Sequence, residues 1–537
     1  MKPIYKWPFF SYFLKRPRFV QYSAALPSGE IFKKQISNQW FKDGEELIRK
    51  NLRRKVISNK AKGVIVFIGD GMGISTVTAG RILDGQLKNQ TGEENILSWE
   101  DNDNFPNVAL SKTYNTDMQT SDSAGTATAI MTGVKTKSGV ISLNENAKRS
   151  DCASSKGQDV LSVIMLAEMA GLSTGVVTTA RITHATPATA YAHSAERSWE
   201  ADVDVPVGSS CKDIASQLID FPYGDGLEVA FGGGRRNFLP NSEKDIGEKG
   251  LFGKRSDGRN LVHEWLNKSK HHYYVNNEKG FKNLHPEKVD HVLGLFNYDH
   301  MQYSYDRRND IAGEPSLTDM VEFAVKVLSK NDKGYVLLVE AGRVDHGHHA
   351  SKPFQALHDT VEMGRAVKKA TSMTNPEETL TIVTADHSHV FTFGGYQSRG
   401  TDIFNYTNAK RFIAKDGQRF TSLSYANGPG GGLRPPTNEQ LKDKDFKWPS
   451  LVPLNSETHG AEDVGIYARG TQSHLIRGVV EQNYIFHVVD YALCLSQNKQ
   501  KLCAEEKTTT KSSSSKKSLI PILQAVMPAL YVLVILL

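Results

Sequence analysis

The sequence predicts an α/β fold with a doubly wound, mostly parallel central sheet flanked by helices. Short apolar runs rich in β-branched residues recur along the chain, and each ends in glycine or polar residues. Buried parallel strands have this character where they enter loops. Helical patterns lie between the runs, for example at 159–171 and 317–330. Because strand and helix alternate in this way, the chain favours a doubly wound sheet.

Five apolar runs are the predicted strands: 63–73, 174–188, 227–237, 333–347 and 380–389. Before the first of them, apolar residues at roughly helical spacing predict a charged helix over 36–60. Between 397 and 456 the chain is rich in Gly, Pro, Asn and Lys, so we expect an inserted surface subdomain there. Residues 1–35 are a poorly defined N-terminal segment, and 504–518, rich in Ser, Thr and Lys, predict a flexible stalk.

Residues 519–537 form a 19-residue apolar run, preceded by serines and a short polar spacer. This is the pattern of a GPI-attachment signal. It predicts cleavage within 512–515 and a protein held at the outer face of the plasma membrane. A single tail-anchor helix is the alternative that the length permits. A GPI-anchored protein needs a signal peptide, yet Lys15, Arg16 and Arg18 interrupt the apolar N-terminus.

The composition is that of a soluble globular body. Of the 537 residues, 39% are apolar and 23% are charged, and the formal net charge is +6. Acidic and basic residues are mixed along the chain, and basic clusters are as short as the one at 53–55. Nucleic-acid binding would need a basic stripe, so we expect no nucleic-acid partner.

Four cysteines stand as two pairs far apart in the chain, Cys152 with Cys211 and Cys494 with Cys503. None forms a CxxC motif, which argues against a zinc–thiolate site. They are either four buried thiols or two disulfides, 152–211 and 494–503, typical of an oxidising compartment. Three N-glycosylation sequons are compatible with secretion: Asn89, Asn267 and Asn405.

Polar residues gather where the predicted strands end, a place where such sheets carry their sites. They are Asp70, His184, Thr186, Glu340, Asp345, His346, His348, His349, Asp386, His387 and His389, with Glu457, His459, Glu462 and Asp463 in a later segment. Mixed imidazole and carboxylate sets suit zinc, and oxygen-only sets suit magnesium. Crowded His and Asp residues at the ends of apolar strands would repel and desolvate one another unless a cation compensated them. We therefore expect a metal site.

Asp122 and Ser123 stand directly before a run of small residues at 124–129. A helix that starts with small residues leaves its free N–H groups approachable, and these groups favour an anion. A metal ion beside such a serine can turn its hydroxyl into an alkoxide, which predicts a nucleophile. The alternative is that Ser123 only caps the helix.

Seven segments between about residues 36 and 503 resemble, in order, the signature segments of animal alkaline phosphatases. They read GDGMG, TDMQTSDSAGTATAIMTGVKT, VVTTARITHATPA, YAHSAERSWEAD, VEAGRVDHGHH, TADHSHVFTFGGY and ETHGAEDV. The resemblance implies a catalytic domain over 36–503 that hydrolyses a broad range of phosphate monoesters. It also implies a phosphoserine intermediate and the assistance of two zinc ions and one magnesium ion.

The resemblance assigns a role to each candidate residue. Ser123 resembles the nucleophile, Arg197 the arginine that grips the phosphate, and His184 a histidine that lines the site. The first zinc would take Asp345, His349 and His459. The second would take Asp70, Ser123, Asp386 and His387, with Asp122 as a neighbour of the nucleophile. Magnesium would take Asp70, Thr186 and Glu340.

Further expectations about assembly and calcium follow from the resemblance. The segment 397–456 would be a crown-like insertion at a homodimer interface, where the helix at 36–52 embraces the partner and Tyr396 reaches the partner's site. A calcium site is doubtful because Asn297 stands where vertebrate members carry an acidic residue, although Glu314 matches another ligand.

Three alternative functions are weaker on the same residues. A phosphodiesterase or sulfatase of the same superfold uses a different nucleophile context, and the segment DSAGTATA together with Arg197 argues against it. A non-catalytic surface protein with this fold predicts broken ligand positions, and none is visible. A Ser-His-Asp acyl hydrolase would need a GxSxG elbow, which we do not expect in this chain.

Overall fold

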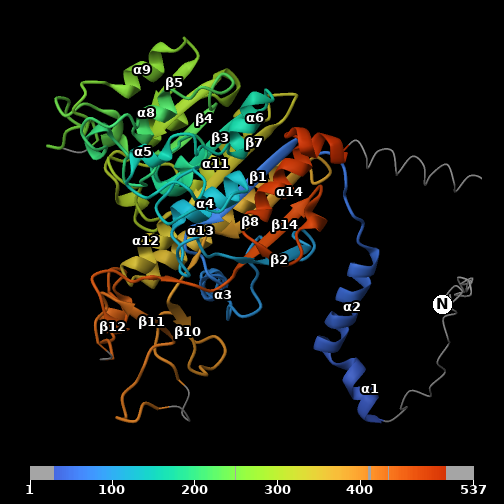
Figure 1. Ribbon diagram of the computed structural model, residues 1–537. Coiled ribbons are helices and arrows are strands. Elements are labelled where there is room, and N and C mark those ends of the chain that lie inside the picture. The colour runs from blue at the N-terminus through green and yellow to red at the C-terminus, as the bar shows by residue number, and fades with distance from the viewer. Residues whose placement is uncertain (1–29, 248–249, 409–412, 433–434, 504–537) are drawn as a thin grey trace, which may run out of the picture. The chain divides into compact units, whose positions relative to one another are not determined.

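The computed structural model describes residues 30–247, 250–408, 413–432 and 435–503 (Figure 1). The predicted stalk and apolar C-terminal run, and the N-terminal segment up to residue 29, lie outside the described residues. The chain forms two compact units, 1–56 and 57–537.

The first unit holds two helices, α1 (Glu30–Ser37) and α2 (Gln39–Arg53). Asn38 separates them, because its backbone is extended and its side chain accepts a backbone N–H that caps α2. The prediction of one helix over 36–60 is wrong at both ends: this cap divides the helix, and the chain returns to extended backbone at Arg54.

The second unit is built on a ten-stranded sheet with the order β15-β2-β14-β8-β1-β7-β3-β4-β6-β5. Its strands are β1 (Gly63–Gly69), β2 (Asn107–Lys112), β3 (Ser173–Arg181), β4 (Val229–Gly233), β5 (His272–Val275), β6 (His291–Leu295), β7 (Tyr335–Ala341), β8 (Thr379–Ala385), β14 (Val464–Gly470) and β15 (Gly478–Glu481). All run parallel except β14, which is antiparallel to β2 and β8. The predicted mostly parallel sheet is confirmed, and the five predicted runs are β1, β3, β4, β7 and β8.

The central strand β1 shows why these runs are continuously apolar. It lies between β7 and β8, and every one of its residues is buried. Val64 and Val66 join the hydrophobic cluster on one face of the sheet, and Ile65 and Phe67 join the cluster on the other. Because helices cover both faces, neither set of alternating positions can be polar.

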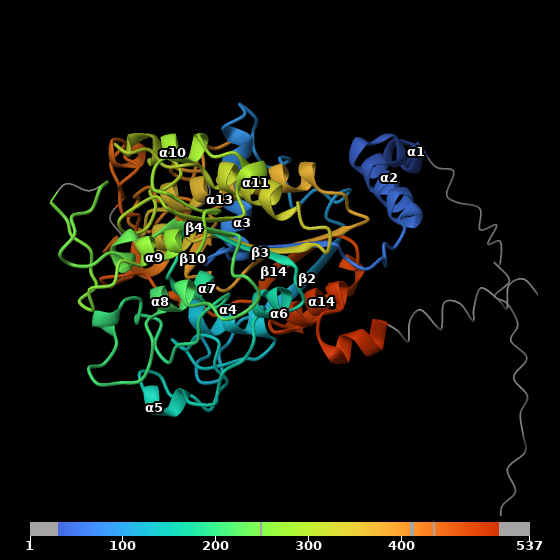
Figure 2. The same ribbon diagram turned by 90° about the horizontal axis from the view of Figure 1, so that it is seen from above.

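Helices cover both faces of the sheet, with α3, α11 and α13 on one side and α4, α6 and α14 on the other (Figure 2). The helices of this unit are α3 (Ile74–Gln86), α4 (Ser123–Thr132), α5 (Cys152–Ser155), α6 (Val163–Met169), α7 (Ala185–Ala188), α8 (Ile214–Ile219), α9 (Leu261–Asn267), α10 (Glu278–Lys282), α11 (Leu317–Leu328), α12 (Arg343–His349), α13 (Pro353–Met373) and α14 (Tyr484–Leu493). The helical patterns at 159–171 and 317–330 correspond to α6 and α11.

Near the carboxyl ends of the central strands, the chain adds two small sheets. The first pairs β9 (Ser388–His389) with β13 (His459–Gly460). The second, which we call the outer sheet, has the order β10 (Phe391–Phe393), β11 (Leu423–Gly428) and β12 (Ser450–Pro453). The hydrophobic cluster of the outer sheet includes residues of α3 and α13, so the outer sheet packs against the main body. The outer sheet begins a few residues before the predicted insertion at 397–456.

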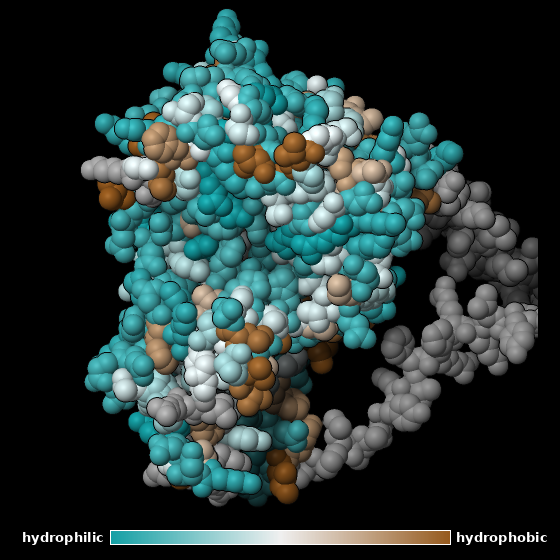
Figure 3. Space-filling model, turned by 60° about the vertical axis from the view of Figure 1, so that its left-hand side comes forward, coloured by the Kyte–Doolittle hydropathy of each residue, from teal (hydrophilic) through white to brown (hydrophobic). Residues whose placement is uncertain are grey.

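The two disulfides Cys152–Cys211 and Cys494–Cys503 are both present. The face shown in Figure 3 is largely hydrophilic, with hydrophobic side chains in small separate patches. Among the described helices, none is long and apolar enough to cross a membrane. The sequence does contain one GxSxG match, GLSTG at 171–175, but Ser173 is the first residue of β3 and not a strand-to-helix elbow.

Candidate active site

Ser123 is the first residue of α4 and is buried at the N-terminus of that helix. Its hydroxyl lies 3.1 Å from Nε2 of His387 and 3.4 Å from Oδ1 of Asp70. The residue that caps the helix is Asp122, whose Oδ1 accepts the N–H of Gly125 at 3.2 Å. The interpretation that Ser123 only caps the helix is therefore excluded, and its hydroxyl faces two of the predicted metal ligands.

Asp122 also holds Arg197. Its Oδ2 accepts hydrogen bonds from Nη1 of Arg197 at 3.0 Å and from the N–H of Gly139 at 2.9 Å. Burial would raise the pKa of Asp122, but the Arg197 guanidinium and the N–H groups of Gly139 and Gly125 hold it below its usual value. Asp122 is therefore charged at neutral pH and holds the guanidinium on the side chain next to Ser123 in the sequence.

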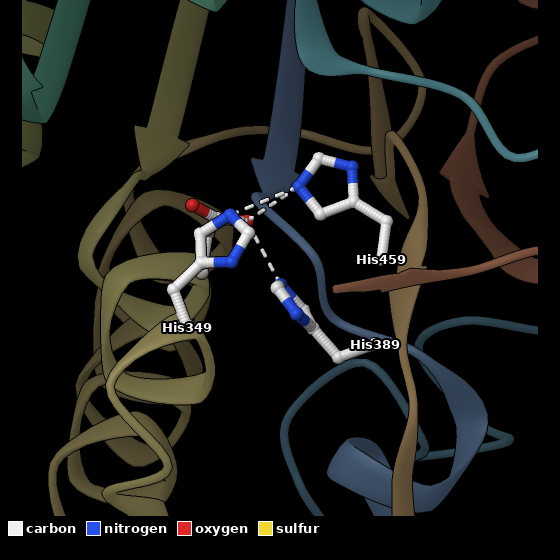
Figure 4. A group of neighbouring side chains, drawn as sticks. His349, His389 and His459 are labelled. Carbon is white, nitrogen blue, oxygen red and sulfur yellow. Dashed lines mark hydrogen bonds and ion pairs between the residues drawn. The ribbon is translucent and has the colours of Figure 1, made fainter. Parts of the chain in front are cut away.

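His349 of α12 and His459 of β13 meet beside Asp345. Figure 4 shows the imidazoles of His349, His389 and His459 pointing toward one another. Nδ1–H of His349 donates to the Glu457 carbonyl at 2.6 Å, and Nδ1–H of His459 donates to the Ser121 carbonyl at 2.7 Å. A neutral imidazole carries one N–H, so each ring turns a bare Nε2 inward.

These two Nε2 atoms lie 3.0 Å apart, and both lie within 3.4 Å of Oδ1 of Asp345. Lone pairs and a carboxylate at such distances repel unless a cation lies between them. A proton is disfavoured there, because burial lowers the pKa of His349 despite the Asp345 charge. The arrangement instead matches nitrogen and oxygen ligands of a divalent metal ion.

His387 repeats this arrangement on the other side of Ser123. Its Nδ1–H donates to the Ser388 carbonyl at 3.2 Å, so its bare Nε2 faces Asp70 Oδ1 and Asp386 Oδ2, each 3.4 Å away. Asp70 follows β1 and Asp386 follows β8. Both therefore lie at the carboxyl edge of the sheet, where the sequence predicted the site. Burial, then Asp386, raises the pKa of Asp70 well above its usual value, and a bound cation would remove that penalty.

Unpaired polar atoms mark the same places. Within the described residues, four buried oxygens of predicted ligands have no hydrogen-bond partner: Asp70 Oδ2, Thr186 Oγ1, Glu340 Oε1 and Asp386 Oδ2. Such oxygens also occur elsewhere in the described residues, but these four belong to predicted ligands, and a bound cation would satisfy them. Donor atoms of Asp70, His184 and Glu340 lie close enough together to form a further metal-binding group.

No role was predicted for His389, although it lies close enough to Asp345, His349 and His459 to share a metal ion with them. Its Nε2 lies 2.8 Å from Oδ1 of Asp345, and its Nδ1 lies 2.5 Å from Oε2 of Glu457. Burial opposes a charge on the ring, but the Glu457 and Asp345 carboxylates raise the pKa of His389 to about 10. Both nitrogens are therefore protonated, and His389 orients Asp345 as a donor.

The sequence placed His389 and Glu457 among the polar residues near the strand ends, in the segments DHSH and ETHG, but gave no signal for their pairing. Most neighbours in those segments are polar, and the sequence does not show which nitrogen of a histidine meets a carboxylate.

His184 lines the site beside Arg197, whose Nη2 lies 3.2 Å from its Nε2. The rings of His300 and His346 are also close to it, with centroids 5.3 and 5.6 Å away. His300 is already engaged, because the backbone N–H of Arg181 donates to its Nδ1 at 3.1 Å and Nη1 of Arg181 lies 2.5 Å from its Nε2. Because the cationic Arg181 guanidinium already contacts His300, we assign no further metal ion to the imidazoles of His184, His300 and His346.

The two residues considered for calcium bind each other. The Asn297 amide donates to Oε1 of Glu314 at 2.7 Å, and the N–H of Gln302 donates to Oε2 at 2.9 Å. Both oxygens of this buried carboxylate therefore accept bonds from the protein. Because calcium binds through clustered oxygen ligands, this donor set does not fit it, and we assign calcium no role.

The fold and this site define an α/β metalloenzyme in which a serine hydroxyl and an arginine face a cluster of metal-binding side chains. The family model "Alkaline phosphatase" matches residues 61–495. The tissue-nonspecific alkaline phosphatase isozyme of Felis catus is 47% identical over 483 residues, covering 87% of this chain and 90% of that protein. The alkaline phosphatase of Gadus morhua is 48% identical over 455 residues, covering 82% and 93%.

Solved structures agree on the fold. The chain resembles the alkaline phosphatase of Thermus thermophilus with a TM-score of 0.60 and 22% identity, covering 83% of this chain and 94% of that one. It resembles the alkaline phosphatase of the Antarctic bacterium TAB5 with a TM-score of 0.56 and 20% identity, covering 82% and 100%. The chain belongs to the alkaline phosphatase family, and its reaction is the hydrolysis of phosphate monoesters.

Proposed function

We propose that the chain hydrolyses phosphate monoesters through a phosphoserine formed on Ser123, with two zinc ions and one magnesium ion held around it. The observation that carries this proposal is the set of three imidazoles, His349, His387 and His459, which each donate Nδ1–H to a backbone carbonyl. A bare Nε2 that faces a carboxylate is arranged for a metal ion, and the outer hydrogen bond fixes both the tautomer and the ring orientation.

The donor sets divide among three ions. One zinc would be held by Asp345, His349 and His459, and the other by Asp70, Asp386 and His387 beside the Ser123 hydroxyl. Magnesium would be held by Asp70, Thr186 and Glu340, which offer oxygen atoms only. The mixed nitrogen and oxygen sets suit zinc, and the oxygen-only set suits magnesium. When bound, these cations supply positive charge that offsets the phosphate and lowers the pKa of a nearby hydroxyl or water.

The side chains of the protein perform the positioning. Ser123 Oγ attacks phosphorus, so that the Oγ–P bond forms while the bond to the ester oxygen breaks and the alcohol leaves with a proton. Arg197, held by Asp122, can bind two non-bridging oxygens in a bidentate fork. Water then attacks phosphorus, the Oγ–P bond breaks, and inorganic phosphate leaves. Because every contact in this scheme is made to the phosphate, we expect little selectivity for the alcohol.

The test is to trap the intermediate with a phosphate ester labelled on phosphorus, followed by an acid quench. The wild-type holoenzyme should retain covalent label, and Ser123→Ala should retain none. Ser75→Ala is a matched control, because Ser75 lies in the first turn of α3, a helix on the other face of the sheet from α4. Label that persists in Ser123→Ala would overturn the assignment of the nucleophile.

Assembly and location belong to the same proposal. A homodimer that uses the outer-sheet region is supported by Tyr396, which is 78% exposed and has a positive φ of 56° next to β10. The expected domain limits of 36–503 and the insertion at 397–456 remain predictions. Attachment to the outer face of the plasma membrane through a lipid rests on the C-terminal sequence. Release of the protein from intact cells by a GPI-specific phospholipase would test it.

The three sequons are compatible with an extracellular location, because Asn89, Asn267 and Asn405 are all exposed. Mass analysis of the secreted or released protein before and after removal of N-glycans would show which of them are modified.

A further inference from the structure

His348 stands between the predicted metal ligands of α12 and is itself completely buried. Its Nε2 lies 3.0 Å from the hydroxyl of Thr76 in α3, and its Nδ1 lies 3.0 Å from the hydroxyl of Tyr425 in β11. Both partners are buried as well. The imidazole therefore spans the space between a helix of the main body and a strand of the outer sheet, with both of its nitrogens satisfied.

The helix that carries His348 is short and depends on such contacts. α12 has seven residues, and no side chain caps its N-terminus. A helix this short has little stability of its own, so bonds to its surroundings determine where Asp345 and His349 lie. The ring of His348 also packs against Phe391 of β10, with centroids 4.8 Å apart.

We infer that Tyr425 and Thr76, acting through His348, position α12 so that Asp345 and His349 are held in the geometry of the first zinc site. His348, Tyr425 and Thr76 are positioning residues, and the outer sheet becomes part of the metal site through one phenol hydroxyl. The inference rests on the proposed function, because it assumes that zinc occupies this site.

Two further contacts indicate that the outer sheet supports the site. The N–H of Glu457 donates to the carbonyl of His349 at 2.9 Å, and the N–H of Trp448 donates to the carbonyl of Ser351 at 2.8 Å. The segments on either side of β12 are therefore bonded to the C-terminal end of α12 and to the turn that follows it. Tyr425 is the outer-sheet residue whose hydroxyl bonds to the side of this helix, at His348.

The experiment compares two tyrosine variants of the full-length holoenzyme. Tyr425→Phe removes the hydroxyl that meets His348. Tyr406→Phe removes a hydroxyl of another buried tyrosine in the same region, which donates to the carbonyl of Pro436 and not to His348. Each variant is loaded with zinc and magnesium and challenged with a chelator. Zinc release is followed with a zinc-sensitive dye, and kcat and KM are measured at limiting and at saturating zinc.

We expect Tyr425→Phe to release zinc about tenfold faster than the wild type, within the 10- to 100-fold range found for residues that support metal ligands. Its kcat should fall at limiting zinc and recover at saturating zinc, with KM unchanged. Tyr406→Phe should match the wild type in zinc release. Equal zinc release from the two variants, even if both unfold at a lower temperature, would overturn the inference.

Substitutions at His348 test whether Tyr425 and Thr76 act on the zinc site through this imidazole. His348→Asn keeps a polar atom near the position of Nδ1, and His348→Ala keeps none. We expect His348→Asn to retain zinc better than His348→Ala. If His348→Ala does not fold, Thr76→Val provides the second measurement, because it removes only the other bond. A wild-type protein that binds no zinc would contradict the proposed function itself, whereas a zinc-binding wild type with an unaffected Tyr425→Phe would contradict this inference alone.

Discussion

Two clusters of buried or partly buried carboxyl groups lie at opposite edges of the same sheet. At the carboxyl edge, Asp70 and Asp386 face the bare Nε2 of His387. At the amino edge, Glu168 and Glu228 lie on either side of Thr174: Glu168 Oε1 accepts from the Thr174 hydroxyl at 2.5 Å, and Glu228 Oε2 accepts from its N–H at 2.6 Å. Among the described residues, no ion pair joins either glutamate to a basic side chain.

The two clusters differ in whether protons can neutralise their negative charge. Burial, then the Glu228 carboxylate, raises the pKa of Glu168 to about 9, and burial raises the pKa of Glu228 to about 7. These two groups can bind protons. At the carboxyl edge, hydrogen bonds fix the tautomers of His349, His387 and His459. The lone pair on each Nε2 is not readily protonated. Burial alone therefore does not identify a metal site, and the histidine tautomers make the distinction.

The largest expected effect comes from removing the divalent cations. A chelator should reduce activity about 1,000-fold or more, since the cations stabilise the charge of the transferring phosphate. The apo protein should also unfold at a lower temperature, because a ligand present at 1,000 times its Kd stabilises the folded state by about 4 kcal/mol. Activity assays and thermal scans with and without added zinc and magnesium test both effects. Full activity after verified metal removal would contradict the interpretation of the carboxyl edge.

The same substitution made at each edge sharpens the comparison. Glu340→Gln removes a carboxylate of the proposed magnesium site, and we expect activity to fall about 100-fold with loss of bound magnesium. Glu168→Gln at the amino edge should leave kcat and KM unchanged. Steady-state kinetics and metal analysis of the two purified variants provide the measurement. Comparable losses of activity from both substitutions would mean that the two edges are not functionally distinct.

Much of the carboxyl edge was predictable from the sequence, because motif and topology act together there. Apolar runs that end in Asp70 and Asp386 indicate parallel strands, and parallel strands bring their ends to one edge. The segment DHGHH places Asp345 and His349 four residues apart, which one turn of helix brings together. The cap was harder to assign, since Asp122 and Ser123 are both good capping residues and only the structure shows which one faces the N–H groups.

Other features depend on tertiary contacts that local patterns do not encode. Glu168 stands in an ordinary helical pattern, and nothing nearby shows that its carboxyl group is buried against Thr174. The partners of His348 are distant in the chain, at Thr76 and Tyr425. The strand β2, which lies between β15 and β14, escaped prediction because three of its six residues are exposed, so its sequence lacks the apolar continuity of the central strands.

A smaller effect is expected on stability at alkaline pH. Because the pKa of Glu168 is raised in the folded protein, its protonated form stabilises the fold. That stabilisation is fully present below about pH 4.5 and is lost as the pH rises toward 9. Glu168→Gln cannot ionise and keeps an acceptor for the Thr174 hydroxyl. At pH 9 to 10 we expect it to be more stable than the wild type by about 2 kcal/mol, as measured by the thermal midpoint across pH. A wild type and variant that lose stability in parallel above pH 7 would contradict this assignment.

Glu228→Gln should give the smallest effect, and in a different pH range. Glu228 is only partly buried, and its pKa is raised to about 7, so its stabilising proton is lost between pH 4.5 and 7. The variant should therefore exceed the wild type in stability by about 1 kcal/mol already at pH 8.

Glu228→Gln should also lower the pKa of Glu168, because the Glu228 charge is one of the causes that raise it. The gain from Glu168→Gln should then be smaller in a Glu228→Gln background, since groups in contact are not additive. Additive gains at every pH would show that the two carboxyl groups titrate independently.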